Sequence, residues 1–385
     1  MRVGLNATSF HPGSMGGMET YFRNLVDRVQ VLDHENEYLI LCDKRFAKEV
    51  PLVNPNFRLE YINYAKPSPA WFLRGAVRNI FNRDMLAGRM NRVKADVIHH
   101  PFTVLTPPDI KLPSVLTFWD MQHEFFPEFF SRTELLKRQR LYRISSERAT
   151  QIIVSATFTK ECLTDRYGIE AEKIEVIHTG YGPEYRPVDN SELLAAIRDK
   201  YGLARPFLLY PAATWPHKNH KRLLAALKLM RERHAFEGLL VLTGIAMQSH
   251  SDIQVEISRL GLTDDVKILG YLPAADLPGL YNCARLMVFP SLFEGFGIPL
   301  VEAMACGCPV VCSNTTSLPE VAGDAGVTFD PLDSEAMATA IWSVWNDEGE
   351  LTRMRAQGLE RASRFNWNDT ARKTMAVYKK ACGAA

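Results

Sequence analysis

The chain has 385 residues, 46% of them hydrophobic and 23% charged, with a formal net charge of +1 at pH 7. This length exceeds what one hydrophobic core usually organises, and the ordinary composition excludes an intrinsically disordered chain, so we expect a two-domain globular protein. The near-zero net charge excludes a nucleic-acid footprint over the whole molecule but leaves room for a local basic patch.

The chain begins with a strand pattern, MRVGLNATSF, and lacks an apolar signal region. No stretch approaches the roughly 20 apolar residues that a membrane-spanning helix needs. We therefore expect a cytoplasmic protein, and we leave open a peripheral contact with an anionic membrane at the inner face of the plasma membrane.

Short aliphatic or β-branched runs alternate with helix-period segments, a pattern that predicts parallel sheets wound with helices. The first half contains VGL, YLIL, FRLEYI, DVIHH, SVLTF, QIIVS and IEVI, and the second half contains FLLY, LLVLTG, VKILG, LMVFP and PVVC. Between them, residues 178–187 form a stretch rich in Gly and Pro, HTGYGPEYRP, which predicts a linker. We expect an α/β fold of two doubly wound, Rossmann-like domains, residues 1–182 and 183–365, followed by a helical segment, residues 366–385.

The first strand is followed by GSMGGMET, which opens the first predicted helix. Gly16 and Gly17 would let backbone amides face a diphosphate at this helix start. The alternative is an ordinary strand-to-helix turn in which Glu19 complements the helix dipole.

Residues 71–94, WFLRGAVRNIFNRDMLAGRMNRVK, contain six basic residues and one acid. A basic amphipathic surface attracts anionic lipid, so this segment is a candidate contact with a membrane. The alternative is a helix whose core stripe contains Leu73, Val77 and Ile80, with solvated arginines on the opposite face.

The run SVLTFWDMQHEFF places Trp119 and Asp120 at the end of a strand. Because ligands of open α/β sheets bind beyond the carboxyl ends of the strands, Asp120 is a candidate to contact sugar hydroxyls or to orient its loop. Trp119 is a packing residue or a platform for a sugar face. His123 and the histidines of DVIHH are further candidates, with a hydrogen-bonded structural histidine as the alternative.

In the second half, the first strand is followed by PAATWPHKNHKR. Lys218 would place a compact positive charge where a departing diphosphate needs it, with His217 beside it. For Lys221 and Arg222 we favour a solvated helix start.

The segment from Ser291 to Gly307, SLFEGFGIPLVEAMACG, predicts a strand, a glycine turn and a short helix. Pro299 suits the first turn of a helix, and Gly307 suits the position after its end. The backbone of Gly295, Phe296 and Gly297 would approach an anionic or hydroxyl-rich ligand closely, with Glu294 on the loop and Glu302 inside the helix. The alternative is a structural turn with two solvated glutamates.

The segment SNTTSLPEV follows the PVVC strand and supplies hydroxyl and N–H groups at another helix start, which helix capping alone would explain. The seven cysteines of the chain are an odd number, and Cys306, Cys308 and Cys312 lack the spacing of a zinc site. We read the cysteines as buried thiols in a reducing compartment.

Taken together, these motifs resemble glycosyltransferase family 4, the large group of retaining GT-B enzymes. The resemblance rests on GGMETY, PHKN, the E-x7-E pair from Glu294 to Glu302, CGCPVVCSNTTSLPEVAGDAG and the late FNW segment, and it spans essentially the whole chain. It implies an N-terminal acceptor-side domain, a C-terminal donor-binding domain, a cleft between their facing sheets and a last helix that crosses back. It also places Thr316, Ser317 and Leu318 near the donor phosphates. Two positions depart from the family pattern, since Trp119 replaces a His and Ala213 replaces an Arg. His217, Lys218, His220 or an Arg of the other domain would then supply the missing positive charge.

The resemblance further implies a hexosyltransferase that moves a sugar from a nucleotide diphosphate to an acceptor hydroxyl with retention. Glu302 would accept the ribose hydroxyls and Glu294 a hydroxyl of the transferred sugar, while Lys218 and the glycine amides stabilise the departing phosphate. The sequences of the segments SLFEGFG, SNTTSLPE and PHKN are similar to those of bacterial mannosyltransferases of polysaccharide and O-antigen assembly. This similarity favours GDP-mannose over a UDP-sugar as the donor. The acceptor would be a glycan or a lipid-linked saccharide.

The chain has no D-x-D triplet, so we expect no metal requirement and no cofactor beyond the nucleotide sugar. Two rival functions stay open. A nucleotide-sugar epimerase of the same fold would convert the donor without an acceptor, and a weakly active sugar-nucleotide binding protein would bind the donor without turnover.

Overall fold

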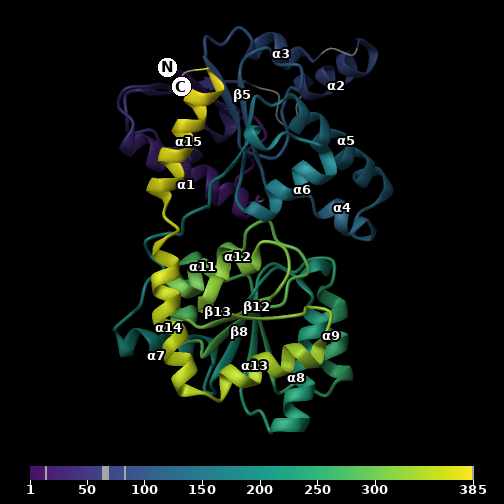
Figure 1. Cartoon of the computed structure of the whole chain (residues 1–385), viewed down its shortest axis with the longest axis vertical. Helices are drawn as coiled ribbons and strands as arrows, with labels where there is room; N and C mark the ends of the chain where they lie inside the picture. Colours follow the sequence, from purple (N-terminus) through teal and green to yellow (C-terminus); the bar gives the residue numbers. More distant parts are fainter. Residues whose placement is uncertain (14, 63–68, 82–83, 384–385) are drawn as a thin grey trace. The chain divides into compact units, whose positions relative to one another are not determined.

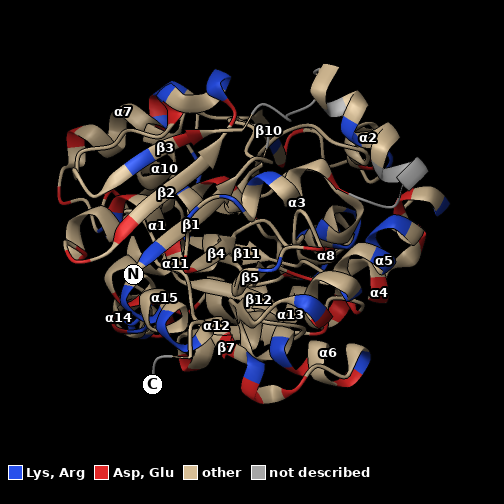
Figure 2. Ribbon diagram, turned by 90° about the horizontal axis from the view of Figure 1, so that it is seen from above, with Lys and Arg blue, Asp and Glu red and all other residues tan. Residues whose placement is uncertain are grey.

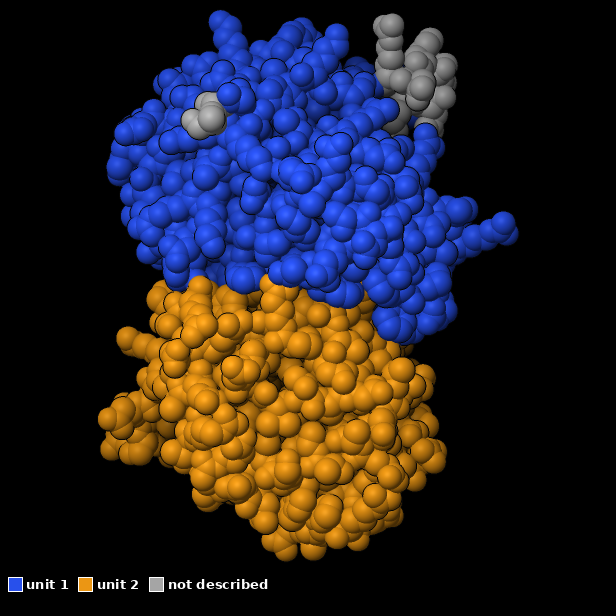
Figure 3. Space-filling model, viewed as in Figure 1, with its two compact units in different colours: residues 1–180, 366–385 blue, residues 181–365 orange. Residues whose placement is uncertain are grey.

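The computed structural model describes residues 1–13, 15–62, 69–81 and 84–383. The chain divides into two compact units, Met1–Gly180 together with Asn366–Ala385, and Tyr181–Phe365 (Figure 3). The division falls inside the stretch 178–187 that is rich in Gly and Pro. Each unit contains one fully parallel sheet with helices on its faces, which confirms the predicted α/β class with two doubly wound sheets.

Figure 1 draws the first unit with its helices α1 to α6 and α15 around the sheet that contains β5. The described strands of this parallel sheet follow the order β3-β2-β1-β4-β5-β6-β7. The strands are β1 (Arg2–Ala7), β2 (Glu37–Cys42), β3 (Phe57–Tyr61), β4 (Val97–His100), β5 (Ser114–Phe118), β6 (Gln151–Val154) and β7 (Ile174–Val176). The helices are α1 (Gly17–Leu32), α2 (Pro69–Phe81), α3 (Met85–Met90), α4 (Gln122–Phe125), α5 (Arg132–Arg148), α6 (Thr157–Tyr167) and α15 (Trp367–Ala381), with 3-10 turns η1 (Lys44–Glu49), η2 (Pro127–Phe129) and η3 (Ala171–Lys173). β4 and β5 are buried along their whole length, as expected for parallel strands covered on both faces.

The second unit contains a parallel sheet whose described strands follow the order β10-β9-β8-β11-β12-β13. The strands are β8 (Phe207–Pro211), β9 (Leu239–Thr243), β10 (Val266–Gly270), β11 (Leu286–Phe289), β12 (Val310–Ser313) and β13 (Gly326–Phe329). The helices are α7 (Ser191–Tyr201), α8 (His220–His234), α9 (His250–Arg259), α10 (Leu277–Cys283), α11 (Ile298–Ala305), α12 (Leu318–Ala322), α13 (Ser334–Trp345) and α14 (Glu348–Ser363), with 3-10 turns η4 (Pro216–Lys218), η5 (Ala274–Asp276) and η6 (Gly323–Ala325). The strand order reverses between β8 and β11, because β9 and β10 extend to one side of β8 and the later strands to the other.

The last helix, α15, belongs to the first unit although it follows the second along the chain. Its buried residues join the same core cluster as α1 and the central strands, and the hydroxyl of Tyr378 lies 2.8 Å from His99 Nδ1 on β4. The helix start is equally tight, since a Cβ built at Gly180 would lie 2.4 Å from the backbone nitrogen of Trp367. The apolar face of α15 and this close approach keep the helix on the first unit.

The basic segment 71–94 forms α2 and α3, with residues 82 and 83 outside the described part. The predicted core stripe is wrong for Leu73, whose exposed fraction is 55%, and Phe72 beside it is 62% exposed. Val77 is half-buried, and the side chain of Ile80 lies outside the described part. This segment therefore presents apolar side chains to solvent, while elsewhere basic and acidic residues are interspersed along the helices (Figure 2).

In the described part of the chain, no helix combines the length and the apolar composition needed to cross a bilayer.

Candidate active site

The predicted donor residues of the second unit gather at the point where its strand order reverses. β8 and β11 are neighbours in the sheet, and the segments that carry Lys218 and Glu294 follow their carboxyl ends. A backbone hydrogen bond of 2.8 Å, from Leu292 N to His217 O, ties the two segments together. Such a switch point is where open parallel sheets bind ligands.

An ion pair joins the two segments at this point. Lys218 Nζ lies 2.6 Å from Glu294 Oε1, and the two side chains are only 16% and 13% exposed. Lys218 Nζ also lies 5.5 Å from the ring centroid of Phe289, the last residue of β11. A pair with little solvent access interacts more strongly than a surface pair, because water screens it less.

The backbone next to Lys218 is held in place by buried side chains. Asn219 has a positive φ of 61°, a conformation that Asn tolerates better than most residues, and its Nδ2 donates to Pro290 O at 3.0 Å and to Pro331 O at 2.8 Å. The hydroxyl of Tyr210 on β8 donates to Lys218 O at 2.7 Å. Both partners fix the direction in which the lysine leaves the backbone.

The glycine loop before α11 is fixed by hydroxyl groups that follow β12. Glu294 N donates to Thr316 Oγ1 at 3.2 Å, and Ser317 Oγ lies 3.0 Å from the carbonyl oxygens of both Glu294 and Phe296. Ser317 is the N-cap residue of α12, but its hydroxyl makes no cap hydrogen bond. Helix capping therefore does not account for this serine, which holds the glycine loop instead.

Gly297 turns the chain into α11 with a φ of 100°, a conformation that residues with a side chain rarely adopt. A Cβ at this position would lie 2.8 Å from Leu318 Cδ2. Leu318 and Phe296 are buried, so their side chains pack the turn while the backbone of Gly295 to Gly297 leads into the helix N-terminus. The first N–H groups of a helix lack intrahelical partners and favour anions.

Glu302 lies on α11, and its carboxyl group is hydrogen-bonded by two tyrosines. Tyr281 OH of α10 donates to Glu302 Oε2 at 3.3 Å, and the Tyr185 hydroxyl bonds the same carboxyl group. Burial raises the pKa of Glu302 to about 7, while the two tyrosine hydrogen bonds act to lower it. Glu302 is therefore not a solvated surface glutamate, and its charge changes near neutral pH.

The histidines next to Lys218 do not add positive charge. Burial, with the Lys218 charge as a smaller cause, lowers the pKa of both His217 and His220 to about 3. Burial therefore keeps both rings neutral at neutral pH in the protein without donor, so of the groups that could replace the family arginine, Lys218 is the charged one in this segment. Lys221 forms an exposed ion pair with Asp252 at 2.8 Å, as expected for a solvated helix start.

The remaining predicted residues belong to the first unit. Gly16, with a φ of 54°, is the N-cap of α1, Gly17 is its first residue, and nothing lies within 4 Å of a Cβ built at Gly16. Asp120 follows β5, where its Oδ1 accepts a 3.1 Å hydrogen bond from Gln122 N and so orients the start of α4. Residue 14 of the same turn lies outside the described part.

Of the aromatic and histidine candidates of the first unit, Trp119 is partly buried, and His99 and His123 are fully buried. Trp119 Nε1 donates to Pro101 O at 2.8 Å, and its ring meets Tyr21 edge-on at 4.8 Å. His99 lies between Tyr378 OH at 2.8 Å and Thr117 Oγ1 at 2.7 Å. His123 is fully buried with Tyr167 OH 3.3 Å from its Nε2. The structural alternative fits all three side chains.

Three functional candidates were not singled out from the sequence. Tyr281 and Tyr185 contact Glu302 from distant segments, and no local pattern marks either of them. Asn219 had a usable signal, since it lies in the PHKN motif and Asn is enriched at positive φ.

Two family models match the chain in succession. The model described as Glycosyltransferase Family 4 matches residues 15–185, and the model described as Glycosyl transferases group 1 matches residues 195–361. The O-antigen chain mannosyltransferase B of Escherichia coli is 30% identical over 369 residues, which are 94% of this chain and 96% of that protein. The serotype-specific mannosyltransferase WbdA of Escherichia coli is 33% identical over 231 residues, which are 58% of this chain and 28% of that protein.

Among solved structures, sucrose-phosphate synthase from Thermosynechococcus elongatus resembles this fold with a TM-score of 0.78 and 20% identity, covering 100% of both chains. At that identity the likeness concerns the fold alone. The two family models and the full-length relative confirm the resemblance found in the motifs. The chain therefore belongs to glycosyltransferase family 4, and it is a glycosyltransferase with the GT-B fold.

Proposed function

We propose that this glycosyltransferase transfers mannose from GDP-mannose to a hydroxyl group of a glycan, with retention at the anomeric carbon. The observation that carries the proposal is the Lys218–Glu294 ion pair beside the glycine loop, at the switch point of the second unit. The choice of mannose is supported by the similarity to O-antigen chain mannosyltransferase B over nearly the whole chain.

In this proposal the second unit binds the donor. Glu302 accepts hydrogen bonds from both ribose hydroxyls, and Glu294 accepts one from a hydroxyl of the mannose. The amides of Gly295, Phe296 and Gly297 support that sugar. Lys218, the neutral His217 and the segment from Thr316 to Leu318 then lie on the side of the diphosphate.

The reaction breaks the bond between the anomeric carbon and the donor phosphate oxygen and forms a bond from that carbon to the acceptor oxygen. The acceptor proton passes to the departing phosphate, so no protein nucleophile is needed. Negative charge develops on the departing phosphate in the transition state. Lys218 and the amides at the start of α11 stabilise the transition state, which carries this charge, more than they stabilise the bound donor. This difference is the condition for catalysis.

In the first unit, the backbone amides at Gly16 and Gly17 are proposed to face the donor diphosphate, and Asp120 is proposed to contact sugar hydroxyls or to orient its loop. We propose a glycan or lipid-linked saccharide as the acceptor and the cytoplasmic face of the membrane as the place of action, because the exposed apolar and basic surface of α2 and α3 suits a bilayer interface.

The proposed reaction uses no metal ion. The sequence has no D-x-D triplet to hold a metal–diphosphate complex, and Lys218 supplies positive charge at the switch point. The transfer rate is therefore expected to be unchanged when EDTA is added. A rate that falls in EDTA and returns when Mg²⁺ or Mn²⁺ is added would contradict this part of the proposal.

The donor is tested first by the thermal shift of the purified protein with GDP, UDP, ADP, GDP-mannose and UDP-glucose. A ligand that binds only the native state raises the apparent stability, by about 2.7 kcal/mol at a hundred times its Kd. We expect a shift with GDP and GDP-mannose that Glu302→Ala abolishes and Glu192→Ala, an exposed control on the same unit, leaves intact.

The outcomes separate the rival functions. A thermal shift with UDP alone would identify a UDP-sugar as the donor in place of GDP-mannose. No shift with any nucleotide would contradict the proposed donor site. Donor turnover without an acceptor, giving an altered nucleotide sugar, would indicate an epimerase. Donor binding without transfer to any glycan would indicate a binding protein. Mannose released onto a glycan acceptor with retained configuration, detected by NMR, is the expected result.

A further inference from the structure

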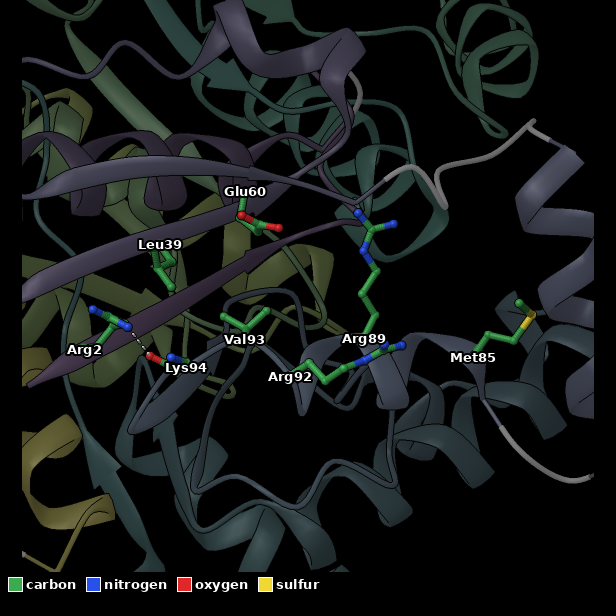
Figure 4. A pocket seen from close by; sticks show the side chains of 8 residues that line it. All are labelled: Arg2, Leu39, Glu60, Met85, Arg89, Arg92, Val93 and Lys94. Carbon is green, nitrogen blue, oxygen red and sulfur yellow. Dashed lines mark hydrogen bonds between the residues drawn. The ribbon is translucent and has the colours of Figure 1, made fainter.

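A hollow of about 770 Å³ lies in the first unit, beside β2, β3 and α3 (Figure 4). Its three arginines, Arg2, Arg89 and Arg92, each donate a hydrogen bond to a backbone carbonyl oxygen, at 3.1, 2.9 and 2.9 Å. These bonds give each arginine a structural role, and none of the residues that line the hollow belongs to the proposed donor site. The hydrogen bonds around Glu302 in the second unit differ, because they join a residue of the proposed donor site to the linker.

The linker contacts the carboxyl group of Glu302. Tyr185 lies in the stretch 178–187, and its hydroxyl hydrogen-bonds that carboxyl group. Tyr281 OH of α10 donates to Glu302 Oε2 at 3.3 Å, and the rings of the two tyrosines meet edge-on with their centroids 6.0 Å apart. Tyr185, Tyr281 and Glu302 all belong to the second unit. One tyrosine of the linker and one tyrosine of a helix therefore hold the same carboxyl group.

The two tyrosines leave part of the acceptor capacity of Glu302 free. An ionised carboxylate has about four lone-pair sites, and two hydroxyl donors leave about two of them open. Burial raises the pKa of Tyr185 and of Tyr281, so both hydroxyls stay protonated and act as donors. Glu302 is half-buried, so part of its side chain is open to a ligand. The remaining sites match the pair of hydroxyl groups on a ribose ring.

Asn282 of α10 holds the backbone of the linker next to Tyr185. Its Nδ2 donates to Arg186 O at 3.0 Å, and its Oδ1 accepts from Val188 N at 2.8 Å. The backbone N–H of Arg186 also bonds the thiol of Cys306, the residue that follows α11. The linker is thus fixed both to α10 and to the end of the helix that carries Glu302. This arrangement sets the direction in which Tyr185 leaves the backbone.

We propose that Tyr185 is a positioning residue for the donor: its hydroxyl, together with that of Tyr281, turns the Glu302 carboxyl group so that the free lone-pair sites face the ribose hydroxyls. The inference rests on the proposed binding of ribose by Glu302, and it adds the linker to the donor site. Without the Tyr185 hydroxyl, the carboxyl group is held by one tyrosine only and must be ordered when the donor binds, which lowers the affinity. A purely structural tyrosine would instead affect all ligands of the second unit alike.

The expected effect of Tyr185 is on affinity and not on the chemical step. The loss of one hydrogen bond that orients a charged group should weaken ribose binding about tenfold. The ribose is bound in the same way in the ground state and in the transition state. Tyr185→Phe should therefore raise KM for GDP-mannose by about tenfold and change kcat by less than about twofold.

The test is calorimetric titration of Tyr185→Phe with GDP and with ddGDP, the analogue of GDP that lacks both ribose hydroxyls. Phenylalanine keeps the ring and removes only the hydroxyl group. We expect the Kd for GDP to rise about tenfold and the Kd for ddGDP to rise less than about twofold, because ddGDP makes no ribose contact with Glu302. The control Tyr201→Phe removes a hydroxyl bonded to Asp276 in the same unit, and it should leave both Kd values unchanged.

Asn282→Ala tests the clamp on the linker, since in this inference Asn282 reaches Glu302 only through Tyr185. With its fold checked by circular dichroism, this variant should show the same selective loss of affinity for GDP. An unchanged affinity for GDP in Asn282→Ala would overturn the role of the clamp.

Equal losses for GDP and ddGDP in Tyr185→Phe would overturn the proposal in favour of a packing role, and so would an unchanged Kd for GDP. If the wild type binds UDP and not GDP, the proposed donor is wrong, and the same comparison with UDP and ddUDP decides the role of Tyr185. Binding of neither nucleotide by the wild type would overturn the donor site and this inference together. A failure of the proposed donor is therefore distinguishable from a failure of the linker contact.

Discussion

Lys218 and Glu294, which are separated by 76 residues in the sequence, lie 2.6 Å apart at the switch point of the second unit. The two charges neutralise each other in the protein without donor. In the proposed complex, the nucleotide sugar would place a diphosphate beside the lysine and a sugar hydroxyl beside the glutamate. The ion pair would then position both groups before the donor arrives, which lowers the cost of ordering them.

Removing the lysine should affect catalysis and stability separately. Lys218→Met is expected to lower kcat by about 10²–10³-fold, as loss of one group that stabilises the developing charge does. It should also lower the free energy of unfolding by about 1–3 kcal/mol, because a partly buried carboxylate loses its partner. Steady-state kinetics and urea unfolding measure the two effects.

The double variant Lys218→Met with Glu294→Gln supplies the control. Its stability should return toward that of the wild type, since no unpaired charge is left, whereas its activity should stay low. Recovery of both properties would mean that the lysine acts only by neutralising Glu294.

Donor binding should depend on pH through Glu302. A carboxylate accepts two ribose hydroxyls, and a protonated carboxyl group cannot do so equally well. With a pKa of about 7 in the free protein, the Kd for GDP should rise about tenfold between pH 8 and pH 6. Calorimetric titration of GDP across this range tests the dependence, and a flat profile would contradict the role of Glu302.

The stability of the free protein should change in the opposite direction. Burial raises the folded-state pKa of Glu302 above its unfolded value, so its contribution to stability is present below about pH 4.5 and is lost as the pH rises through 7. Glu302→Gln should therefore raise the melting temperature more at pH 8 than at pH 5. An equal change at both values would argue against a buried, titrating carboxyl group.

Tyr281 on α10 should influence the pH at which Glu302 changes its charge. Its hydroxyl hydrogen bond acts to lower the pKa of Glu302, so Tyr281→Phe should move the pH dependence of GDP binding to higher pH. Tyr201→Phe, which removes a hydroxyl bonded to Asp276 in the same unit, is the control and should leave the profile in place. A loss of affinity without a shift of the profile would indicate that Tyr281 only packs the site.

The sequence predicted the local parts of this site. Gly297, Pro299 and Gly307 mark the turn, the start and the end of α11. Each could be predicted because the backbone conformation at its position favours that residue type. Most strands of both sheets follow from aliphatic runs that are buried in the structure, although β3 and β10 were predicted from runs that are largely exposed or only partly buried. Strand β13 was missed, because GVTF is short, lies at the sheet edge and is partly exposed.

The long-range parts could not be read from local patterns. The ion pair of Lys218 with Glu294 and the tyrosine contacts of Glu302 depend on which strands are neighbours in the sheet. The alternative that His217 supplies positive charge could not be weighed from the sequence for a related reason, since burial, which no single motif records, lowers the pKa of its imidazole. The roles of Gly16 and Gly17 at the donor diphosphate and of Asp120 at the sugar stay predictions.

The glycine loop should be intolerant of a methyl group. Gly297→Ala combines a φ of 100° with a contact of 2.8 Å to Leu318, so it should lower the free energy of unfolding by about 1–3 kcal/mol and weaken GDP binding. Gly88→Ala is the matched control, because it lies in α3 with open space around a Cβ and should stabilise by up to about 1 kcal/mol. Loss of GDP binding in both variants would exclude a local effect of the loop.

The last helix should stabilise the first unit through one buried hydrogen bond. Tyr378→Phe keeps the ring but leaves His99 Nδ1 without its partner, which should cost about 1–3 kcal/mol of unfolding free energy. Burial lowers the pKa of His99 to about 3, so its contribution to stability is present above pH 6.5 and is lost as the pH falls toward 3. His99→Gln should therefore reduce the acid sensitivity of unfolding, measured by circular dichroism from pH 7 to pH 4. An unchanged acid transition in this variant would mean that other buried groups, such as His100, control it.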